Sequence, residues 1–318
     1  MKDMELVYAI YRNGSFSKAA DELYISQSSL SMAIQRIESE IGVPLFDRRQ
    51  HPVKLTQAGH ELIRFYQDVK PRKTDMLARI QDLAELRSGS ISVGGTHYLL
   101  SYVLPRTIVS FTAQYPNMAL NLIEVPSNRF NDMLLNCDID LCIKCDLDSP
   151  KLQSIGHAFF DKLFLAVPAE QVKPLNLSSN ALNREQIIKG DYHPFDHYFR
   201  IEDFPKLTFL QLSPGNSLYK RSEDIFKHFQ IRPGKVIRFN QFVTTYILAG
   251  NGLGCTLASS RLITQNNQPR LVYYELPTPL IIRDFHFTVR KDAYISRGIQ
   301  AFCSLFTQLE SEEAAQQK

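Results

Sequence analysis

One short stretch of the chain carries small hydrogen-bonding side chains where a surface helix normally carries charges. They are the hydroxyl groups of Ser26, Ser28 and Ser31 and the amide groups of Gln27 and Gln35. At helical spacing, Ser28, Ser31 and Gln35 lie opposite or beside the apolar stripe of the same helix. Side-chain amides pair bidentately with adenine, and hydroxyls donate to bases or phosphates. The stretch therefore predicts a helix face that contacts base edges in the major groove of DNA.

The flanking sequence predicts the elements that hold this face. Residues 4–11 form a first helix, Ser15 caps a second, and Ser26 caps the third, whose apolar residues recur at helical spacing. A basic stretch with a proline, LFDRRQHPVKLT, follows as a hairpin, or wing. The pattern is that of a winged helix-turn-helix. Phosphate contacts are expected from its basic side chains, Arg36, Arg48, Arg49, His51 and Lys54.

A long helix is predicted from about residue 57 to residue 87. Apolar residues repeat along it every seven positions, at Leu62, Val69, Met76 and Leu83, with Tyr66 and Ile80 in the companion row. Such a seam needs a second helix to bury it, so it predicts dimerisation. Pro71 should kink this helix or break it locally.

Bulk properties restrict the classes of protein without selecting one. The 318 residues suffice for two or three domains, and 44% hydrophobic with 22% charged residues is an ordinary globular balance. The net charge is +3, and residues 1–60 hold seven basic and seven acidic residues, so DNA binding must follow from the placement of charge. The sequence offers no membrane span, no signal-peptide core and five cysteines without a disulfide framework. We expect a cytoplasmic protein.

Strand and helix patterns alternate after residue 88. ISVGG, LNLIEV, DLCIKC and FLAVP are predicted strands separated by helices, and a second block with TFLQL, KVIRFN and CTLAS follows Pro168. This order argues for a largely parallel sheet covered by helices.

The order of the N-terminal motifs resembles the LysR-type transcriptional regulator family. The motifs are SFSKAADEL, ISQSSLSMAIQRIE, GVPLFDRR and LTQAGH, and the resemblance continues through ISVGGTHYLLSYVLPRTIVSFTAQYP, DIDLCIKCD and LAGNGLGCTLAS. One departure concerns Met32, because the family usually has arginine or another polar residue there. Methionine cannot contact phosphate or guanine as arginine does, so we expect an altered DNA preference or a weaker affinity.

The resemblance implies an α+β multidomain fold. It consists of an N-terminal winged helix-turn-helix, a long linker helix, and a C-terminal α/β effector domain of two subdomains like a periplasmic binding protein. The expected boundaries are 1–58 for the DNA-binding domain, 59–88 for the linker, 89–310 for the effector domain and 311–318 for a polar tail. Within the effector domain, subdomain one is 89–166 plus 268–310, and subdomain two is 167–267.

A small effector is expected in the cleft between these subdomains. The candidate residues lie at strand ends and helix starts, where backbone N–H groups favour anions. They are Thr96, His97, Cys145, Ser213, Asn240, Phe242 and Thr244. Neutral donors dominate this set, which suits a polar or carboxylated metabolite.

Two other readings stay open. The chain could be a cytoplasmic solute-binding or enzymatic α/β protein whose N-terminal helices only mediate assembly, although G-x-S-x-G, H-E-x-x-H and Walker motifs are absent from the sequence. It could also be a regulator that senses redox state through Cys137, Cys142, Cys145 or Cys255. The cluster His193-Pro194-Phe195-Asp196-His197 is interpreted as a loop, not a metal site.

The sequence therefore predicts a transcriptional regulator that is not an enzyme and needs no cofactor or metal. Its expected partners are a pseudo-palindromic double-stranded DNA operator, a small polar or carboxylated effector, and further copies of itself in a dimer or tetramer. RNA polymerase is an additional candidate partner, and no membrane contact is expected.

Overall fold

The computed structural model describes residues 1–50, 52–83, 89–175, 181–190, 192, 207–230 and 232–316. The chain divides into two compact units, Met1–Leu77 and Ala78–Lys318.

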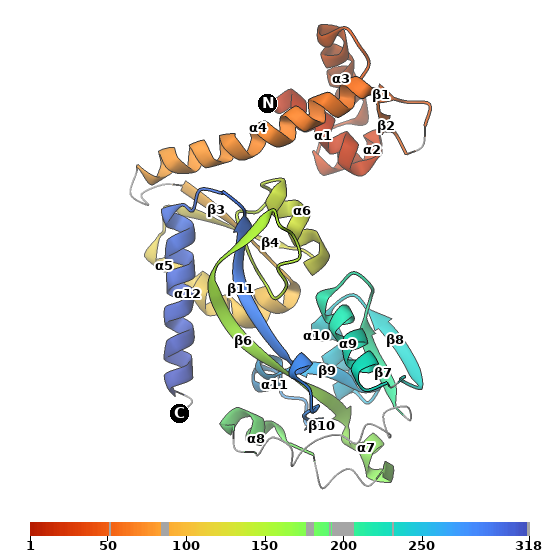
Figure 1. Ribbon diagram of the computed structural model, residues 1–318, viewed down its shortest axis with the longest axis vertical. Coiled ribbons are helices and arrows are strands. Elements are labelled where there is room, and N and C mark those ends of the chain that lie inside the picture. Colours follow the sequence, from red (N-terminus) through yellow and green to blue (C-terminus); the bar gives the residue numbers. More distant parts are fainter. Residues whose placement is uncertain are drawn as a thin grey trace. The chain divides into compact units, whose positions relative to one another are not determined.

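The first unit contains the three predicted helices and the wing. Its elements, shown in Figure 1, are α1 (Lys2–Asn13), α2 (Phe16–Glu22), α3 (Gln27–Ile41), β1 (Phe46–Asp47), β2 (Lys54–Leu55) and the start of α4 (Gln57–Asp82). Ser15 caps α2 by accepting a hydrogen bond from the Lys18 N–H, and Ser26 caps α3 by accepting one from the Ser29 N–H. We call α1, α2, α3 and the wing the head.

A core of apolar side chains holds the head together. Val7 and Ile10 of α1 pack with Leu30 and Ile34 of α3, and all four are fully buried. These two α3 residues are four positions apart and share one face, so the opposite side of α3 is left to solvent. The predicted amphipathic helix is confirmed.

Glu38 fixes the wing to α3. Its Oε1 accepts hydrogen bonds from the backbone N–H groups of Leu45 (2.7 Å) and Phe46 (3.3 Å), and its Oε2 accepts one from Arg48 (3.0 Å). Leu45 and Phe46 are buried, so these N–H groups have no access to water. A single carboxylate therefore sets the position of the hairpin relative to the exposed face of α3.

The long helix α4 begins in close contact with the wing. Thr56 donates from its hydroxyl to the Pro44 carbonyl (2.7 Å) and accepts from the Gly59 N–H (3.1 Å). Ile63 and Tyr66 bury in the core of the head. The helix continues through Pro71 to Asp82, so the predicted local break is wrong.

A seven-stranded mixed sheet forms the frame of the second unit. Its strands are β3 (Gly89–Gly95), β4 (Met118–Glu124), β5 (Leu141–Lys144), β6 (Leu152–Pro168), β9 (Thr256–Ser259), β10 (Leu271–Tyr274) and β11 (Ile282–Arg290). The order is β10-β6-β11-β5-β3-β4, with β9 also paired to β6. Strands β3, β4 and β5 are parallel, as predicted, whereas β6 and β11 cross the unit as an antiparallel pair.

The second half of β6 continues into the second block of the chain. Its residues 163–166 pair with β9, and residues 165–168 pair with β10, which the sequence division assigns to subdomain one. A separate parallel pair, β7 (Thr208–Leu212) and β8 (Lys235–Phe239), connects to this region through a bridge between Phe209 and Cys255. In Figure 1 the green β6 and the blue β11 run side by side through the unit.

Helices pack against the seven-stranded sheet and against the β7–β8 pair. They are α5 (Pro105–Gln114), α6 (Phe130–Leu135), α7 (Ala169–Val172), α8 (Arg184–Lys189), α9 (Ser217–His228), α10 (Phe242–Gly250), α11 (Ser260–Gln265) and α12 (Arg297–Gln316). The predicted helix over 99–115 begins instead with a π-helical turn, Leu99–Val103, before α5. Short 3-10 turns occupy Ser127–Arg129, Lys173–Leu175 and Pro279–Ile281. Among the described helices, none is long and apolar enough to span a bilayer.

The last turn of α4 is bonded to the start of α12. The Asp82 carboxylate accepts hydrogen bonds from the Arg297 backbone N–H (2.9 Å) and the Tyr294 hydroxyl (2.9 Å). The Arg79 guanidinium lies over the Tyr294 ring at 4.2 Å. The last turn of α4 is therefore part of the second unit.

Replacing Gly59 with alanine should destabilise the head. A Cβ at this position would lie 2.2 Å from the Leu45 carbonyl oxygen, and backbone cannot move away as a flexible side chain can. We expect a loss of about 1–3 kcal/mol in the free energy of unfolding. The chain has no Trp, so urea unfolding followed by far-UV circular dichroism is the suitable measurement. Gln57→Ala, at an exposed position of the same turn, is the control, and equal stability of the two variants would contradict the prediction.

Replacing Glu38 with alanine should also destabilise the head, for a different reason. The buried N–H groups of Leu45 and Phe46 would lose their acceptor, which costs about 1–3 kcal/mol. The matched control is Glu40→Ala, since the Glu40 side chain is 64% exposed and its removal should change stability by less than about 0.5 kcal/mol. Urea midpoints that fall equally in both variants would refute the anchoring role of Glu38.

Candidate functional site

The predicted polar face of α3 is accessible. Gln27, Ser28 and Gln35 are exposed, Ser31 is half-buried, and Met32 beside them is 63% exposed. The position of Met32 is about 160° from the buried Ile34 around the helix. The side chains on this face are therefore free to meet a ligand that lies along α3.

Hydrogen bonds among these side chains organise the start of α3. The Ser26 hydroxyl lies 3.0 Å from the Ser28 hydroxyl and 2.7 Å from that of Ser29. The Gln27 amide donates to the Ser31 hydroxyl at 3.3 Å. The hydroxyl and amide groups thus have partners within the helix and can exchange them for base or phosphate groups.

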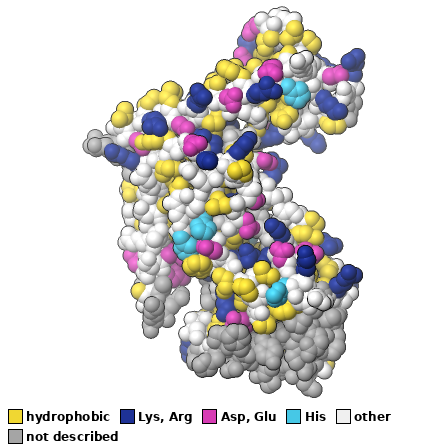
Figure 2. Space-filling view, viewed as in Figure 1, with side chains coloured by type: hydrophobic (Ala, Val, Ile, Leu, Met, Phe, Trp, Pro, Cys, Tyr) yellow, Lys and Arg dark blue, Asp and Glu magenta, His cyan; other side chains and the backbone are white. Residues whose placement is uncertain are grey.

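The arginines expected to contact phosphates are all ion-paired within the head. Arg36 is 2.8 Å from Asp3, Arg48 is 3.0 Å from Glu38, and Arg49 is 3.0 Å from Asp47. Figure 2 shows basic side chains lying beside acidic ones over this part of the molecule. Because exposed ion pairs contribute only about 0–1 kcal/mol, a polyanion can compete for these cations.

The other predicted phosphate contacts differ in placement. Lys54 is exposed in β2, and His51 lies outside the described residues. Arg49 and Gln50 donate hydrogen bonds to Asp47, and these bonds lower the pKa of that carboxyl to about 2. Asp47 therefore stays charged near neutral pH and holds Arg49 at the base of the wing.

Sequence reasoning missed Glu38, whose carboxylate holds the wing. Tyr24, in the turn before α3, is 95% exposed with a φ of 55°. Left-handed backbone at a non-glycine residue is uncommon and marks the tight turn between the two helices. The sequence did hold a signal for Glu38. A carboxylate is unfavourable near DNA phosphates, so an acidic residue on the helix predicted to contact DNA indicates a structural role.

The apolar seam predicted on α4 is exposed over its second half. Met76, Ile80 and Leu83 are 50%, 54% and 83% exposed, and Val69 is half-buried. Leu62 instead packs against the core of the head. Phe65 and Leu77, which sequence reasoning did not include, are also exposed apolar residues of this helix, at 53% and 43%.

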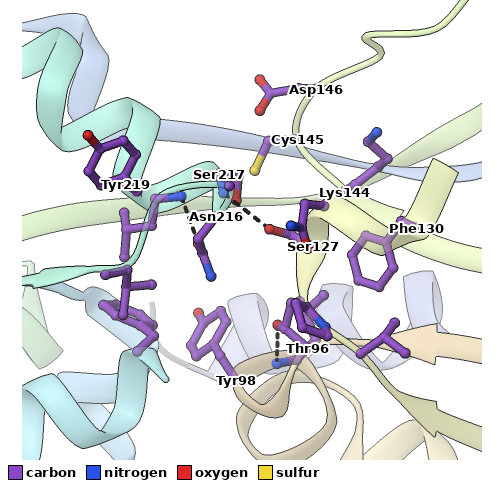
Figure 3. A pocket seen from close by; sticks show the side chains of 18 of the residues that line it. Thr96, Tyr98, Ser127, Phe130, Lys144, Cys145, Asp146, Asn216, Ser217 and Tyr219 are labelled. Carbon is purple, nitrogen blue, oxygen red and sulfur yellow. Dashed lines mark hydrogen bonds between the residues drawn. The ribbon is translucent and has the colours of Figure 1, made fainter. Parts of the chain in front are cut away.

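A cavity of about 640 Å³ lies at the carboxyl ends of two sets of parallel strands. One set is β3, β4 and β5, and the other is β7 and β8. The walls of the cavity come from the ends of β3, β4 and β5, from the loops before α9 and α10, and from β11. Carboxyl ends of parallel strands and the helix starts that follow them are the usual place for ligands in α/β folds. Figure 3 shows polar side chains pointing into this space from opposite walls.

Five of the seven residues predicted to bind an effector line this cavity. They are Thr96, His97, Cys145, Asn240 and Phe242. The two others are not among its lining residues. Ser213 donates to the Phe239 carbonyl (3.2 Å) and to Asn240 (2.9 Å), and Thr244 lies within hydrogen-bond distance of Gln241 (3.5 Å). These two hydroxyls instead form local hydrogen bonds with Asn240 and Gln241, which do line the cavity.

A hydrogen bond across the cavity joins its two sides. The Ser217 N–H at the start of α9 donates to the Ser127 hydroxyl at 3.1 Å. Figure 3 shows this bond, with Asn216 capping the same helix. The loop after β4 and the loop after β7 are therefore in contact at the cavity.

One residue of the cavity wall, Arg283, belongs to a buried ion pair. Arg283 of β11, 7% exposed, bonds to the fully buried Asp161 of β6. The rings of Tyr98, Phe242 and Phe285 surround the guanidinium at 5.0–5.5 Å. Burial alone would lower the pKa of Arg283, but Asp161 reverses this, so the pKa is raised. The group stays charged.

The same ion pair has further polar contacts, one of them to a residue that lines the cavity. Asp161 accepts hydrogen bonds from the Tyr98 hydroxyl (3.0 Å) and the Ser260 hydroxyl (3.1 Å). The Arg283 Nε, however, is buried without a hydrogen-bond partner. Buried donors are usually satisfied, so this Nε is a candidate for a bond to water or to a ligand.

A second cation, Lys144 at the end of β5, lies on another wall. Its Nζ donates to Asp148 and to Asn131, both at 2.7 Å. Burial would raise the pKa of Asp148, but the bonds from Lys144 and Asn131 lower it. The pair leaves this wall polar and close to neutral in net charge.

The cysteines do not form a redox pair in the structure. Cys142 is buried, Cys145 lines the cavity, and both are free thiols. Burial raises the pKa of each to about 12, so both stay protonated and are poor nucleophiles. Burial raises the pKa of Cys255 as well. Across the described ranges no His, Cys, Asp and Glu side chains cluster as a metal site, and His193–His197 lie outside those ranges.

Two family models match the chain along most of its length. "Bacterial regulatory helix-turn-helix protein, lysR family" matches residues 1–60, and "LysR substrate binding domain" matches residues 84–310. A "Probable RuBisCO transcriptional regulator" of Trichormus variabilis is 27% identical over 308 residues, covering 95% of this chain and 86% of the relative. An "Uncharacterized HTH-type transcriptional regulator YcgK" of Bacillus subtilis is 26% identical over 306 residues, covering 96% and 93%.

Solved structures of full-length regulators share the fold. Full-length BenM aligns with a TM-score of 0.58 at 22% identity, covering 98% of this chain and 97% of BenM. Full-length CbnR complexed with its target DNA aligns with a TM-score of 0.57 at 18% identity, covering 97% and 98%. The chain belongs to the LysR family and is a transcriptional regulator with a helix-turn-helix domain and an effector-binding domain.

Proposed function

We propose that this regulator binds a pseudo-palindromic operator as a dimer or tetramer and that a small polar or carboxylated effector occupies the cavity of the second unit. The protein acts in the cytoplasm, where its operator brings it close to RNA polymerase. The observation that carries the effector class is the buried, unpartnered Arg283 Nε in the cavity wall.

The DNA-facing surface is the exposed side of α3 together with the wing. Gln27 and Gln35 are the candidates for adenine contacts, and Ser26, Ser28 and Ser31 for contacts to bases or phosphates. Arg36, Arg48, Arg49, His51 and Lys54 are proposed to contact phosphates, which position the head without selecting a sequence. Each arginine then exchanges its carboxylate partner for a phosphate.

The second half of α4 is the proposed dimerisation surface. Val69, Met76, Ile80 and Leu83 remain candidates, and the exposed Phe65 and Leu77 extend the set. A helix that exposes this many apolar side chains gains stability by pairing with a second copy. Pairing two linker helices gives the two heads the two-fold relation that a pseudo-palindromic operator requires.

The effector acts by selecting one arrangement of the two sides of the cavity. Thr96 and His97 lie on one side and Asn240 and Phe242 on the other, and the Arg283 guanidinium contacts the rings of both Tyr98 and Phe242. A ligand shifts the equilibrium between arrangements only through a difference in its affinity for them. The hydrogen bonds between Asp82 and the start of α12 give the linker helix a direct connection to the unit that holds the cavity.

Replacing Gln27 and Gln35 together with alanine should abolish sequence preference while preserving the fold. A bidentate amide–adenine contact contributes about 1–3 kcal/mol of discrimination, so two should change the preference by at least about tenfold. Binding is measured at about 0.15 M salt, which weakens non-specific phosphate contacts, to a duplex chosen by the wild-type protein from random sequences and to a scrambled duplex.

The control is Gln308→Ala, an exposed glutamine of α12, which should bind as the wild type does. If the double variant keeps the wild-type preference, α3 is not the reading element. If the wild-type protein selects no sequence at all, the operator proposal fails.

Carboxylates should raise the melting temperature of the protein more than their neutral amides do. Acetate, succinate and benzoate are compared with acetamide, succinamide and benzamide. Arg283→Lys should lose the difference, because lysine keeps a charge beside Asp161 but has no Nε–H.

Arg261→Lys alters a half-buried arginine that is paired with Glu310 outside the cavity, so it should keep the wild-type response. A panel in which amides stabilise the protein as much as carboxylates, or in which no member stabilises it, would exclude this effector class.

A further inference from the structure

We infer that Met32 reads the C5-methyl group of a thymine in the major groove, so that the exposed face of α3 recognises A·T base pairs. This inference rests on the proposed DNA-binding function of α3 and adds a specificity-determining residue to it.

The position of Met32 is the first argument. Met32 is 63% exposed, one helical turn from Ser28 and from Gln35, on the side of α3 opposite the buried Leu30 and Ile34. It therefore lies within the face that would meet base edges, with hydrogen-bonding side chains on either side of it. A thioether at this point neither donates a strong hydrogen bond nor pairs with phosphate.

The chemistry of the rest of the face is the second argument. A bidentate contact to guanine requires arginine or lysine, and Arg36 is the only basic residue of α3. Its guanidinium is 2.8 Å from Asp3 and 4.0 Å from Glu40. The other groups on the side of α3 that carries Met32 are amides, hydroxyls and the Met32 side chain itself. Amides fit adenine, and the apolar group in the major groove that matches a flexible thioether is the thymine methyl.

The neighbours of Met32 are held by hydrogen bonds, whereas the Met32 side chain is flexible. The Gln27 amide is bonded to Ser31, and Ser28 is bonded to Ser26, so the polar neighbours start from fixed positions. Met32 has three rotatable bonds and can follow a methyl group that these contacts place nearby. Removal of that methyl group should therefore weaken the contact made by Met32 and change few contacts of other residues.

Replacing thymine with uracil tests the inference, because uracil lacks only the C5-methyl group. The full-length protein is used with a duplex that it has selected from random sequences, and each thymine is replaced by uracil in turn. At one position in each half-site, wild-type affinity should fall about fourfold, the loss expected for one buried methyl group. Met32→Ala should bind the thymine duplex more weakly and show no further loss with uracil at that position.

Two variants control for the nature and the place of the side chain. Met32→Leu keeps an apolar group and should keep the uracil penalty. Ile41→Ala removes an apolar side chain that is 47% exposed but lies about 180° around α3 from Met32, so it should match the wild type in affinity and penalty. Far-UV circular dichroism confirms that each variant is folded.

The outcomes separate this inference from the function on which it rests. A penalty that persists unchanged in Met32→Ala, or no penalty at any thymine of a duplex that is bound specifically, overturns the role of Met32 and leaves the regulator proposal intact. Failure of the wild-type protein to distinguish selected from scrambled duplexes overturns both.

Discussion

The buried pair of Asp161 and Arg283 is the interaction on which the second unit depends most. An unpaired charge in this position would be strongly destabilising, so β6 and β11 must stay in register for the pair to form. Arg283 of this pair lines the cavity, and Asp161 accepts hydrogen bonds from Tyr98 and Ser260. One guanidinium therefore takes part both in the pairing of the crossover strands and in the cavity wall.

The head follows a different electrostatic logic. Its arginines are exposed and paired with nearby carboxylates, so that residues 1–60 carry no net charge when all these groups are ionised and His is neutral. Such pairs are weak in water and give way to a phosphate at small cost. Glu38 is the exception, because it also accepts hydrogen bonds from two buried backbone N–H groups. Arg48 can give up its bond to Glu38, whereas the buried N–H groups of Leu45 and Phe46 need Glu38 as their acceptor.

Local patterns predicted most helices and strands, but not where long elements end or what they contact. The 3.6-residue period identified α3, and the caps at Ser15 and Ser26 were visible because capping involves only neighbouring residues. The full length of β6 was not visible, since its second half is defined by pairing with β9 and β10, about 100 residues later in the chain. Leu62 was assigned to a helix seam because periodicity cannot distinguish a partner helix from the core of the head.

The sequence by itself determined the helix-turn-helix, the long apolar helix and the strand-end residues that line the cavity, because each depends on the order of neighbouring side chains. Only the tertiary structure decided that Arg283 joins those strand-end residues and that Ser213 and Thr244 lie outside the lining. Arg283 is more than 100 residues from Asp161, and only strand pairing brings them together. A single sequence records which groups a chain has, whereas packing decides which of them are desolvated together and therefore able to act on one ligand.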